Sequence, residues 1–244
     1  MKGQARALLR LLAVQGAWSY ERMIGVGMGY AAEPLLHDLG AVEPARLPEA
    51  TARSSEFFNC HPYLAGLALG ASARAEYEGT PGEQILRLRT ALCSPLGALG
   101  DQFFWAGLVP ILLAMALAGI ALGGGGAVLV ALLVVYNVIR VLATHWALRT
   151  GLQSGMQVGT AISASWLPKA VVRVAVPAGF ATGLAVPLVS GWLIAPFGGR
   201  AFAVGLLVCV AALALLRWGG TRWTSLRVGL LAAAVSLFLS RVVP

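Results

Sequence analysis

The stretch Phe103–Gly123, FFWAGLVPILLAMALAGIALG, decides the fold, because it is long, apolar and free of charged residues. A transmembrane helix needs about 20 mostly apolar residues, so this stretch can span a bilayer. The sequence therefore predicts an all-α integral membrane protein with about five transmembrane helices. The other four candidate spans, of which the last two are short, are Ala127–Leu148, Val174–Pro196, Ala201–Arg217 and Val228–Val243.

Charged residues divide the chain into two parts. Of the 244 residues, 58% are hydrophobic and only 11% are charged, whereas soluble domains average roughly 25% charged residues. All ten acidic residues lie between Glu21 and Asp101, and the chain beyond Asp101 carries only isolated cations. We therefore expect residues 1–101 to form a polar half with amphipathic and re-entrant helices, and residues 102–244 to form the transmembrane half.

The cations of the apolar half predict the orientation of the chain. Arg200 and Arg241 are alone on one side, while the opposite connections carry Arg149, Lys169, Arg173, Arg217, Arg222 and Arg227. The positive-inside rule then places the N-terminus in the cytoplasm and predicts a multi-pass protein. These cations border apolar runs and do not cluster. The net charge of +8 therefore indicates contact with membrane lipid, not with nucleic acid.

Two predicted spans contain residues that disturb an apolar helix. Asn137 and Arg140 are three apart, so they lie on one face of the second span. A membrane-embedded arginine needs a partner. Arg140 therefore either binds carbonyl groups of another helix or pairs with an acid of the N-terminal half or of another subunit. Pro177 and Pro187 predict that the third span is kinked or broken.

The N-terminus predicts a helix that lies in the membrane interface. Cations recur there every four residues and so line one helical face, namely Lys2, Arg6 and Arg10. Further on, Gln15, Trp18 and Arg22 share a face as well. The alternative to a ligand-binding role is that this region serves only as an amphipathic anchor.

Polar chemistry gathers in the stretch Glu56–Gly66, EFFNCHPYLAG. Proline disfavours helical geometry in the residue before it, so His61 is expected to leave the helix ahead of Pro62. Asn59 and His61 would then be hydrogen-bonding groups at a broken helix. The apolar run Tyr63–Ala73 that follows is too short to span a membrane, so it is either a re-entrant segment or a core helix.

A second interrupted stretch, SPLGALGDQFFWAG at Ser94–Gly107, has Pro95, Gly97 and Gly100 ahead of Asp101. We expect Asp101 at the N-terminal end of the first span, where a carboxylate can cap amide groups and meet the positive end of the helix dipole. Paired interrupted segments in a membrane protein point to the binding site of a transporter.

These stretches resemble the IID membrane subunit of the mannose/fructose/sorbose family of sugar phosphotransferase systems. The motifs that carry the resemblance are VQGAWSYERM (Val14–Met23), EFFNCHPYLAGLALG (Glu56–Gly70), SPLGALGDQFFW (Ser94–Trp105) and VVYNVIRVLATHWALRTGLQSG (Val134–Gly155). The resemblance implies a substrate path with five candidate residues, which are Asn59, His61, Asp101, Gln15 and Trp18. Structural or partner roles are expected for Pro62, Glu21, Arg22, Asn137 and Arg140.

The resemblance also implies a set of partners. It predicts that the chain pairs with a IIC membrane subunit in a bacterial cytoplasmic (inner) membrane, and that these pairs form a trimer. A hexose-type sugar would cross at their interior. Phosphoryl transfer would belong to IIA and IIB proteins, so this chain is expected to be a non-catalytic subunit without a cofactor. Cys60 in place of threonine and Ser94 in place of glycine depart from the family pattern, which leaves the sugar open.

Two other readings of the sequence remain. The chain would be a non-transporting scaffold or regulatory membrane partner if its phosphotransferase system were reduced to signalling. An enzyme would have to use Cys60, His61 or Asp101, but side chains adjacent in sequence rarely face each other, and no third partner is evident. The three cysteines are widely spaced and form no CxxC pair, so neither a metal site nor a disulfide framework is expected.

Overall fold

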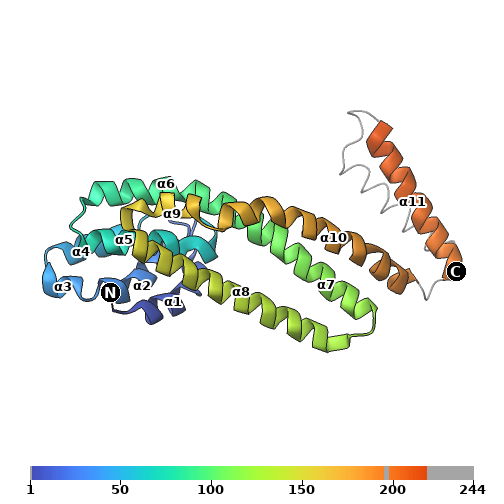
Figure 1. Ribbon diagram of the computed structural model, residues 1–244, viewed down its shortest axis with the longest axis horizontal. Helices are drawn as coiled ribbons and strands as arrows, with labels where there is room; N and C mark the ends of the chain where they lie inside the picture. The colour runs from blue at the N-terminus through green and yellow to red at the C-terminus, as the bar shows by residue number, and fades with distance from the viewer. Residues whose placement is uncertain (1, 195–197, 219–244) are drawn as a thin grey trace.

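The structure, a computed structural model, describes residues 2–194 and 198–218, and its regular elements there are all helical. Figure 1 shows a head of short packed helices from which long helices extend. The head comprises α1 (Gln4–Leu11), α2 (Gly25–Leu36), α3 (Leu39–Val42), α4 (Arg46–Ser54), α5 (Ala65–Tyr77), α6 (Gly82–Gly100) and α9 (Val158–Ala164), with turns η1 (Val14–Ala17), η2 (Pro62–Leu64) and η4 (Gly155–Gln157). The long helices are α7 (Val109–Ala121), α8 (Gly125–Ser154) and α10 (Leu167–Ile194), with α11 (Gly198–Trp218) at the far end.

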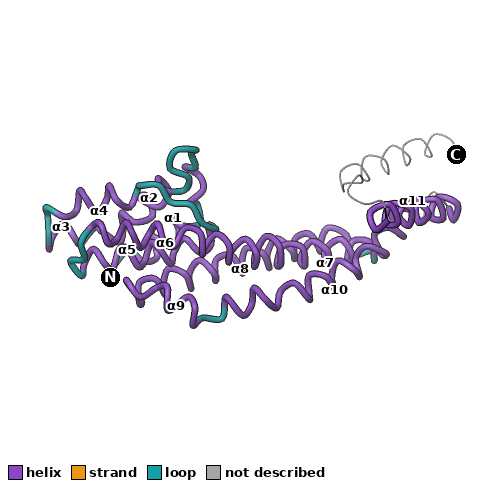
Figure 2. The backbone as a smooth tube through the Cα atoms, turned by 90° about the horizontal axis from the view of Figure 1, so that it is seen from above, coloured by secondary structure: helices purple, strands orange, loops and turns teal. Residues whose placement is uncertain are grey.

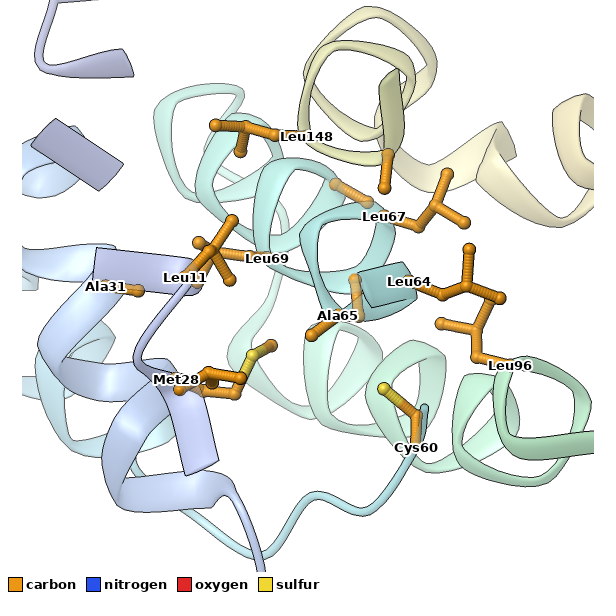
Figure 3. Close-up of a cluster of buried hydrophobic side chains, with 14 of the residues drawn as sticks. Leu11, Met28, Ala31, Cys60, Leu64, Ala65, Leu67, Leu69, Leu96 and Leu148 are labelled. Carbon is orange, nitrogen blue, oxygen red and sulfur yellow. The ribbon is translucent and has the colours of Figure 1, made fainter. Parts of the chain in front are cut away.

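Helix α5 is the centre of the head. Leu67 and Leu69 on this helix are at most 1% exposed, and side chains from α1, α2, α6 and α8 surround them (Figure 3). Burying a leucine side chain stabilises a fold by roughly 1.5–3 kcal/mol, so this cluster supplies much of the head's stability. The apolar run Tyr63–Ala73 therefore forms a core helix of the protein, and its depth in the membrane remains a prediction.

The second half of α8 also belongs to the head. A Cβ added to Gly151 of α8 would lie 2.3 Å from the carbonyl oxygen of Leu67, and one added to Gly66 of α5 would lie 2.6 Å from the backbone nitrogen of Leu148. Only glycine lets the two backbones approach this closely. The head thus recruits residues from beyond position 101, where the sequence analysis placed the boundary between the halves.

The expected interruption at Ser94–Gly107 is wrong. Helix α6 runs through Pro95 and continues without a break into the π-helix η3 (Asp101–Leu108) and then into α7. A π turn contains more residues than an α turn, so the chain accommodates an extra residue here and stays helical. Asp101 consequently lies within a continuous helical run and does not cap the start of a helix.

The long helices carry an aliphatic surface. Leu117 of α7, Leu133 of α8 and Val176 of α10 are each about half exposed or more. Two helical runs, Gly82–Ala121 and Gly125–Leu193, are long and apolar enough to cross a membrane by length and composition. The first four predicted spans coincide with η3 and α7, with α8, with α10 and with α11, although the first runs two residues past the end of α7. Residues 195–196 of the third span and the whole fifth span, Val228–Val243, lie outside the described residues.

Helix α10 passes through both of its prolines. It is continuous from Leu167 to Ile194, with Pro177 and Pro187 inside it, so a broken third span is wrong. A proline in a helix interior removes one hydrogen bond, a loss that a helix can tolerate when its neighbours pack against it. Here the buried Ala181 and Ala185 of α10 pack against Ala114 and Ala118 of α7.

A buried ion-pair cluster joins α4 to the end of α5. The carboxylate of Glu76, only 2% exposed, accepts hydrogen bonds from Arg46 Nε at 2.9 Å and from Arg53 Nε and Nη2 at 2.9 and 3.0 Å. The hydrogen bond to Glu76 raises the pKa of Arg53 despite the opposing effect of burial. Both carboxylate oxygens are therefore satisfied, as a buried charge requires.

Candidate functional site

The site is built on the non-helical segment between α4 and η2. The Ile24 amide donates to the Phe58 carbonyl at 3.0 Å, and the Phe58 amide donates to the Arg22 carbonyl at 3.3 Å. These bonds place the loop that precedes α2 beside the chain that leads to His61. Figure 2 shows loops that project from the head next to α1 and α2.

Arg89 of α6 holds this segment in place. Its guanidinium is 2% exposed, and Nη2 donates to the carbonyls of Ser54 at 3.2 Å and Glu56 at 3.3 Å. It also lies 5.1 Å from the centre of the Phe58 ring, within range of a cation–π contact. Sequence reasoning missed Arg89. The available signal was an arginine on the same helical face as the apolar Ile85 and Leu92 of α6.

His61 joins the segment to η3. Its ring is 1% exposed and stacks on Phe104 at a centroid distance of 4.7 Å and an angle of 17°. On the other side it abuts Gly100, where an added Cβ would lie 2.1 Å from His61 Cβ. The expected break is confirmed at this point, because His61 has an extended backbone (ψ 126°) ahead of Pro62.

His61 is held as a neutral ring. Its Nδ1 accepts a hydrogen bond from the Tyr63 amide at 3.3 Å, so the ring proton is assigned to Nε2. Burial lowers the pKa of His61 to about 4, since the charged form would lose its hydration. At neutral pH the ring therefore acts as a packed connector between two segments and carries no charge.

Asn59 and Asp101 flank this connector and are both exposed. Burial raises the pKa of the Cys60 thiol, which lies between Asn59 and His61. Asp101 directly follows Gly100, the residue that abuts His61. Trp105, half exposed, lies 5.8 Å from the His61 ring. We call Asn59, Asp101 and Trp105 the polar–aromatic patch. It combines an amide, a carboxylate and an indole on a rigid base.

The other two predicted path residues, Gln15 and Trp18, lie on the projecting loop, as do Glu21 and Arg22, for which structural or partner roles are expected. Gln15, Trp18, Glu21 and Arg22 are exposed, and Trp18 packs edge-on against Tyr20 at 4.7 Å. The Arg22 amide is capped by the Ser19 hydroxyl at 3.2 Å. Among the described residues, no side-chain hydrogen bond, ion pair or ring contact joins this loop to the patch, so the two groups are separate.

Asn137 and Arg140 have different surroundings. Arg140 donates to the Leu12 carbonyl at the end of α1, and its guanidinium lies 5.6 Å from the Tyr63 ring. The structure thus favours the carbonyl-binding reading, and within the described residues no acid pairs with Arg140. Asn137 donates to Leu133 of its own helix at 2.9 Å and faces outward. Pro62 is buried at the start of η2.

The geometry offers no support for a nucleophilic enzyme. Cys60 Sγ donates to the His61 backbone carbonyl at 3.3 Å and not to the imidazole, and its raised pKa disfavours the thiolate. Among the described residues no group of His, Cys, Asp and Glu side chains is arranged to hold a metal ion. The patch itself offers an amide, a carboxylate and an aromatic ring.

Long helices with aliphatic surfaces, attached to a head that presents polar and aromatic groups, define a helical membrane protein. The chain belongs to the IID components of the mannose/fructose/sorbose family of the phosphotransferase system (PTS). Residues 2–185 match that family, described as "PTS system mannose/fructose/sorbose family IID component".

Individual relatives agree with this membership. The fructose permease IID component of Bacillus subtilis (strain 168) is 31% identical over 148 residues, which are 59% of this chain and 53% of that protein. The PTS system mannose-specific EIID component of Escherichia coli (strain K12) is 26% identical over 166 residues, or 66% of this chain and 58% of that protein. The chain thus spans little more than half the length of these relatives.

Solved structures share the fold. One described as a membrane protein superposes with a TM-score of 0.65, and a cryo-EM structure of the mannose transporter ManYZ with microcin E492 (MceA) superposes with a TM-score of 0.58. Each is 24% identical, and each match covers 74% of this chain and 68% of the other. The likeness supports the helical arrangement described above.

Proposed function

We propose that this chain is the membrane IID subunit of a phosphoenolpyruvate-dependent sugar permease in a bacterial inner membrane. It crosses the membrane several times with its N-terminus in the cytoplasm and pairs with a IIC subunit, and the pairs assemble into a trimer. IIA and IIB proteins supply the phosphoryl group. This chain lines the path of a hexose-type sugar and performs no bond chemistry itself.

The observation that carries this proposal is the polar–aromatic patch on its rigid base. A sugar is neutral and rich in hydroxyl groups, so it is recognised by directional hydrogen bonds and by an aromatic face, without a large electrostatic cost. Asn59 offers both donors and an acceptor, Asp101 offers acceptors, and Trp105 offers the ring. Recognition groups of this kind work best when packing fixes their supports, as His61 and Phe104 do here.

Two relatives' names support the substrate class. The Escherichia coli relative is called mannose-specific, and a relative from Klebsiella pneumoniae, 26% identical over 189 residues, is called sorbose-specific. A hexose is therefore the first substrate to test, with mannose, fructose and sorbose compared in one assay.

The test is sugar uptake by cells that lack their own transporter and express this chain with IIC, IIA and IIB. We expect Asn59→Ala and Asp101→Ala each to lower uptake by about tenfold, since a lost hydrogen bond to a polar ligand costs on the order of 1–3 kcal/mol. The matched control is Gln84→Ala, an exposed amide at the start of α6, about 24 Å along that helix from Gly100.

Membrane insertion and co-purification with IIC are measured for every variant. Uptake at the wild-type level by both Asn59→Ala and Asp101→Ala would refute the role of the patch. A wild-type chain that co-purifies with its partners and transports no sugar would favour the non-transporting scaffold instead.

A further inference from the structure

Two adjoining hollows lie where α5 and α8 end together. The first has a volume of about 610 Å³ and is lined by Arg74, Glu78, Gln153, Ser154, Met156, Gln157, Thr160, Ala161 and Ala164. The second has a volume of about 540 Å³ and is lined by Gln4, Arg74, His145, Arg149, Leu152 and Gln153. Arg74 and Gln153 line both, so the two hollows lie side by side and share these two residues as a common border.

The first hollow has the lining of a carbohydrate site. The side chains of Gln153, Gln157 and Thr160 are exposed and make no hydrogen bond within the described part of the chain. Amide and hydroxyl groups can each donate and accept, which matches the hydroxyl groups of a sugar. Met156 adds an apolar surface for the C–H face of a ring.

The second hollow has the chemistry of a phosphate site. His145 and Arg149 are four apart and therefore lie on one face of α8, and neither forms an ion pair among the described residues. Arginine binds phosphate oxygens through a fork of N–H donors. Arg74 is held at the boundary, since its Nε donates to Glu78 at 2.6 Å and its Nη1 to the Gln153 carbonyl.

We propose that the paired hollows bind a phosphorylated sugar, with the hydroxyl groups in the first hollow and the phosphate against Arg149 in the second. The inference rests on the proposed function, because the phosphorylated sugar is then the product released into the cytoplasm. The predicted orientation places this end of α8, followed by the cations Arg149, Lys169 and Arg173, on the cytoplasmic side.

The position in the head fits a product site distinct from the polar–aromatic patch. The patch lies beside η2, at the start of α5, whereas Arg74 is nine residues beyond Ala65 on the same helix. Nine residues of α-helix span about 14 Å, so the two sites mark opposite ends of α5. Sugar leaving the patch toward the cytoplasm would reach the hollows within this distance.

The test measures binding to the complex of this chain with its IIC subunit, purified in lipid nanodiscs. The probes are mannose 6-phosphate, mannose, inorganic phosphate and vesicles of phosphatidylglycerol. We expect mannose 6-phosphate to bind more tightly than mannose or phosphate alone. Arg149→Gln should weaken binding of mannose 6-phosphate by about tenfold, as loss of a charge-assisted hydrogen bond predicts.

Two further variants separate the parts of the site. Gln157→Ala should weaken mannose 6-phosphate binding severalfold and leave binding of inorganic phosphate unchanged. Arg173→Gln removes the same charge from an exposed position of α10 that lines neither hollow, so it should change neither affinity. An equal loss in Arg173→Gln would show general charge attraction and overturn the proposal.

The other outcomes are equally clear. Inorganic phosphate that competes as well as mannose 6-phosphate would overturn the sugar half of the site. Binding to phosphatidylglycerol vesicles that depends on Arg149, without binding of mannose 6-phosphate, would assign the hollow to a lipid headgroup. A complex that transports sugar yet binds no phosphorylated sugar would refute this inference and leave the proposed function standing.

Discussion

The head and the long helices are both helical, but they differ in which side chains they bury and which they expose. The head buries charged groups and holds them with specific partners: Glu76 with two arginines, and Arg89 with two backbone carbonyls and the Phe58 ring. The long helices expose aliphatic side chains and hold few polar groups. The head therefore owes its shape to contacts that tolerate little change, and the long helices owe theirs to continuous backbone hydrogen bonding. Substitutions in the head should therefore lower the free energy of unfolding more than substitutions on the long helices.

The largest effect is expected from removing the buried carboxylate of Glu76. Glu76→Ala leaves two arginines without their counter-ion inside the head, and breaking a buried pair in this way costs about 3–5 kcal/mol. The loss is measured as the difference in the free energy of unfolding, in detergent, between wild-type protein and Glu76→Ala. Glu78→Ala is the control, because Glu78 forms a half-exposed pair with Arg74 worth at most about 1 kcal/mol. Equal losses in both variants would contradict the assignment.

The next effect depends on pH. Because the pKa of buried His61 is about 4 and that of an unfolded histidine is 6.5, the unfolded state binds more protons between these values. Stability is therefore fully present above pH 6.5 and falls as the pH drops toward 4, by up to about 1.4 kcal/mol per pH unit. Thermal unfolding of wild-type protein and His61→Gln over this range tests it. The slope should be smaller in His61→Gln than in the wild-type protein, and an equal slope in both would contradict the burial of a neutral His61.

A smaller effect is expected at the contact between the end of α6 and His61. Gly100→Ala would place a methyl group against His61 Cβ and should cost about 1–3 kcal/mol, the usual penalty for overpacking. Gly97→Ala is the matched control on the same helix, since nothing lies within 4 Å of its added Cβ. That variant should gain roughly 0.5–1 kcal/mol through helix propensity. Equal changes in the free energy of unfolding for Gly100→Ala and Gly97→Ala would contradict the described contact.

The smallest effect is expected on the long helices. Leu133→Ala on α8 removes a side chain that is 57% exposed, so no cavity forms inside the chain. We expect the midpoint of unfolding of the purified chain to change by less than the equivalent of about 0.5 kcal/mol. A loss of several kcal/mol would show that this surface is packed against the protein itself, and the contrast between the two regions would fail.

The same contrast explains what could be predicted from the sequence. Hydropathy depends on each segment alone, so it located the helical run that covers most of Phe103–Gly123 and the helix that contains Ala127–Leu148. The turn at His61 was also predictable, because Pro62 acts on its immediate neighbour. These features are local, and a local rule was sufficient for them.

The contacts of the head are not local and could not be predicted. Arg89 meets carbonyl groups more than 30 residues away, and Tyr63 meets the hydroxyl of Tyr136 on α8. The prediction at Asp101 failed for a related reason. Proline and glycine near it indicate a break when considered alone, but the chain continues there as a π-helix, in which Phe104 stacks on the distant His61.

This π-helix accommodates an extra residue within the helical run. Val109 donates its amide to the Phe104 carbonyl, five residues earlier, so η3 holds more residues per turn than α6 or α7. Deleting one residue from η3 would remove the residue that the wide turn accommodates, so the run could become ordinary α-helix while the side chains of α7 keep nearly the same directions. The same deletion inside α6, which is already α-helical, would turn every side chain of α7 by about 100° around the helix axis. Cysteine labelling along α7 would distinguish the two deletions.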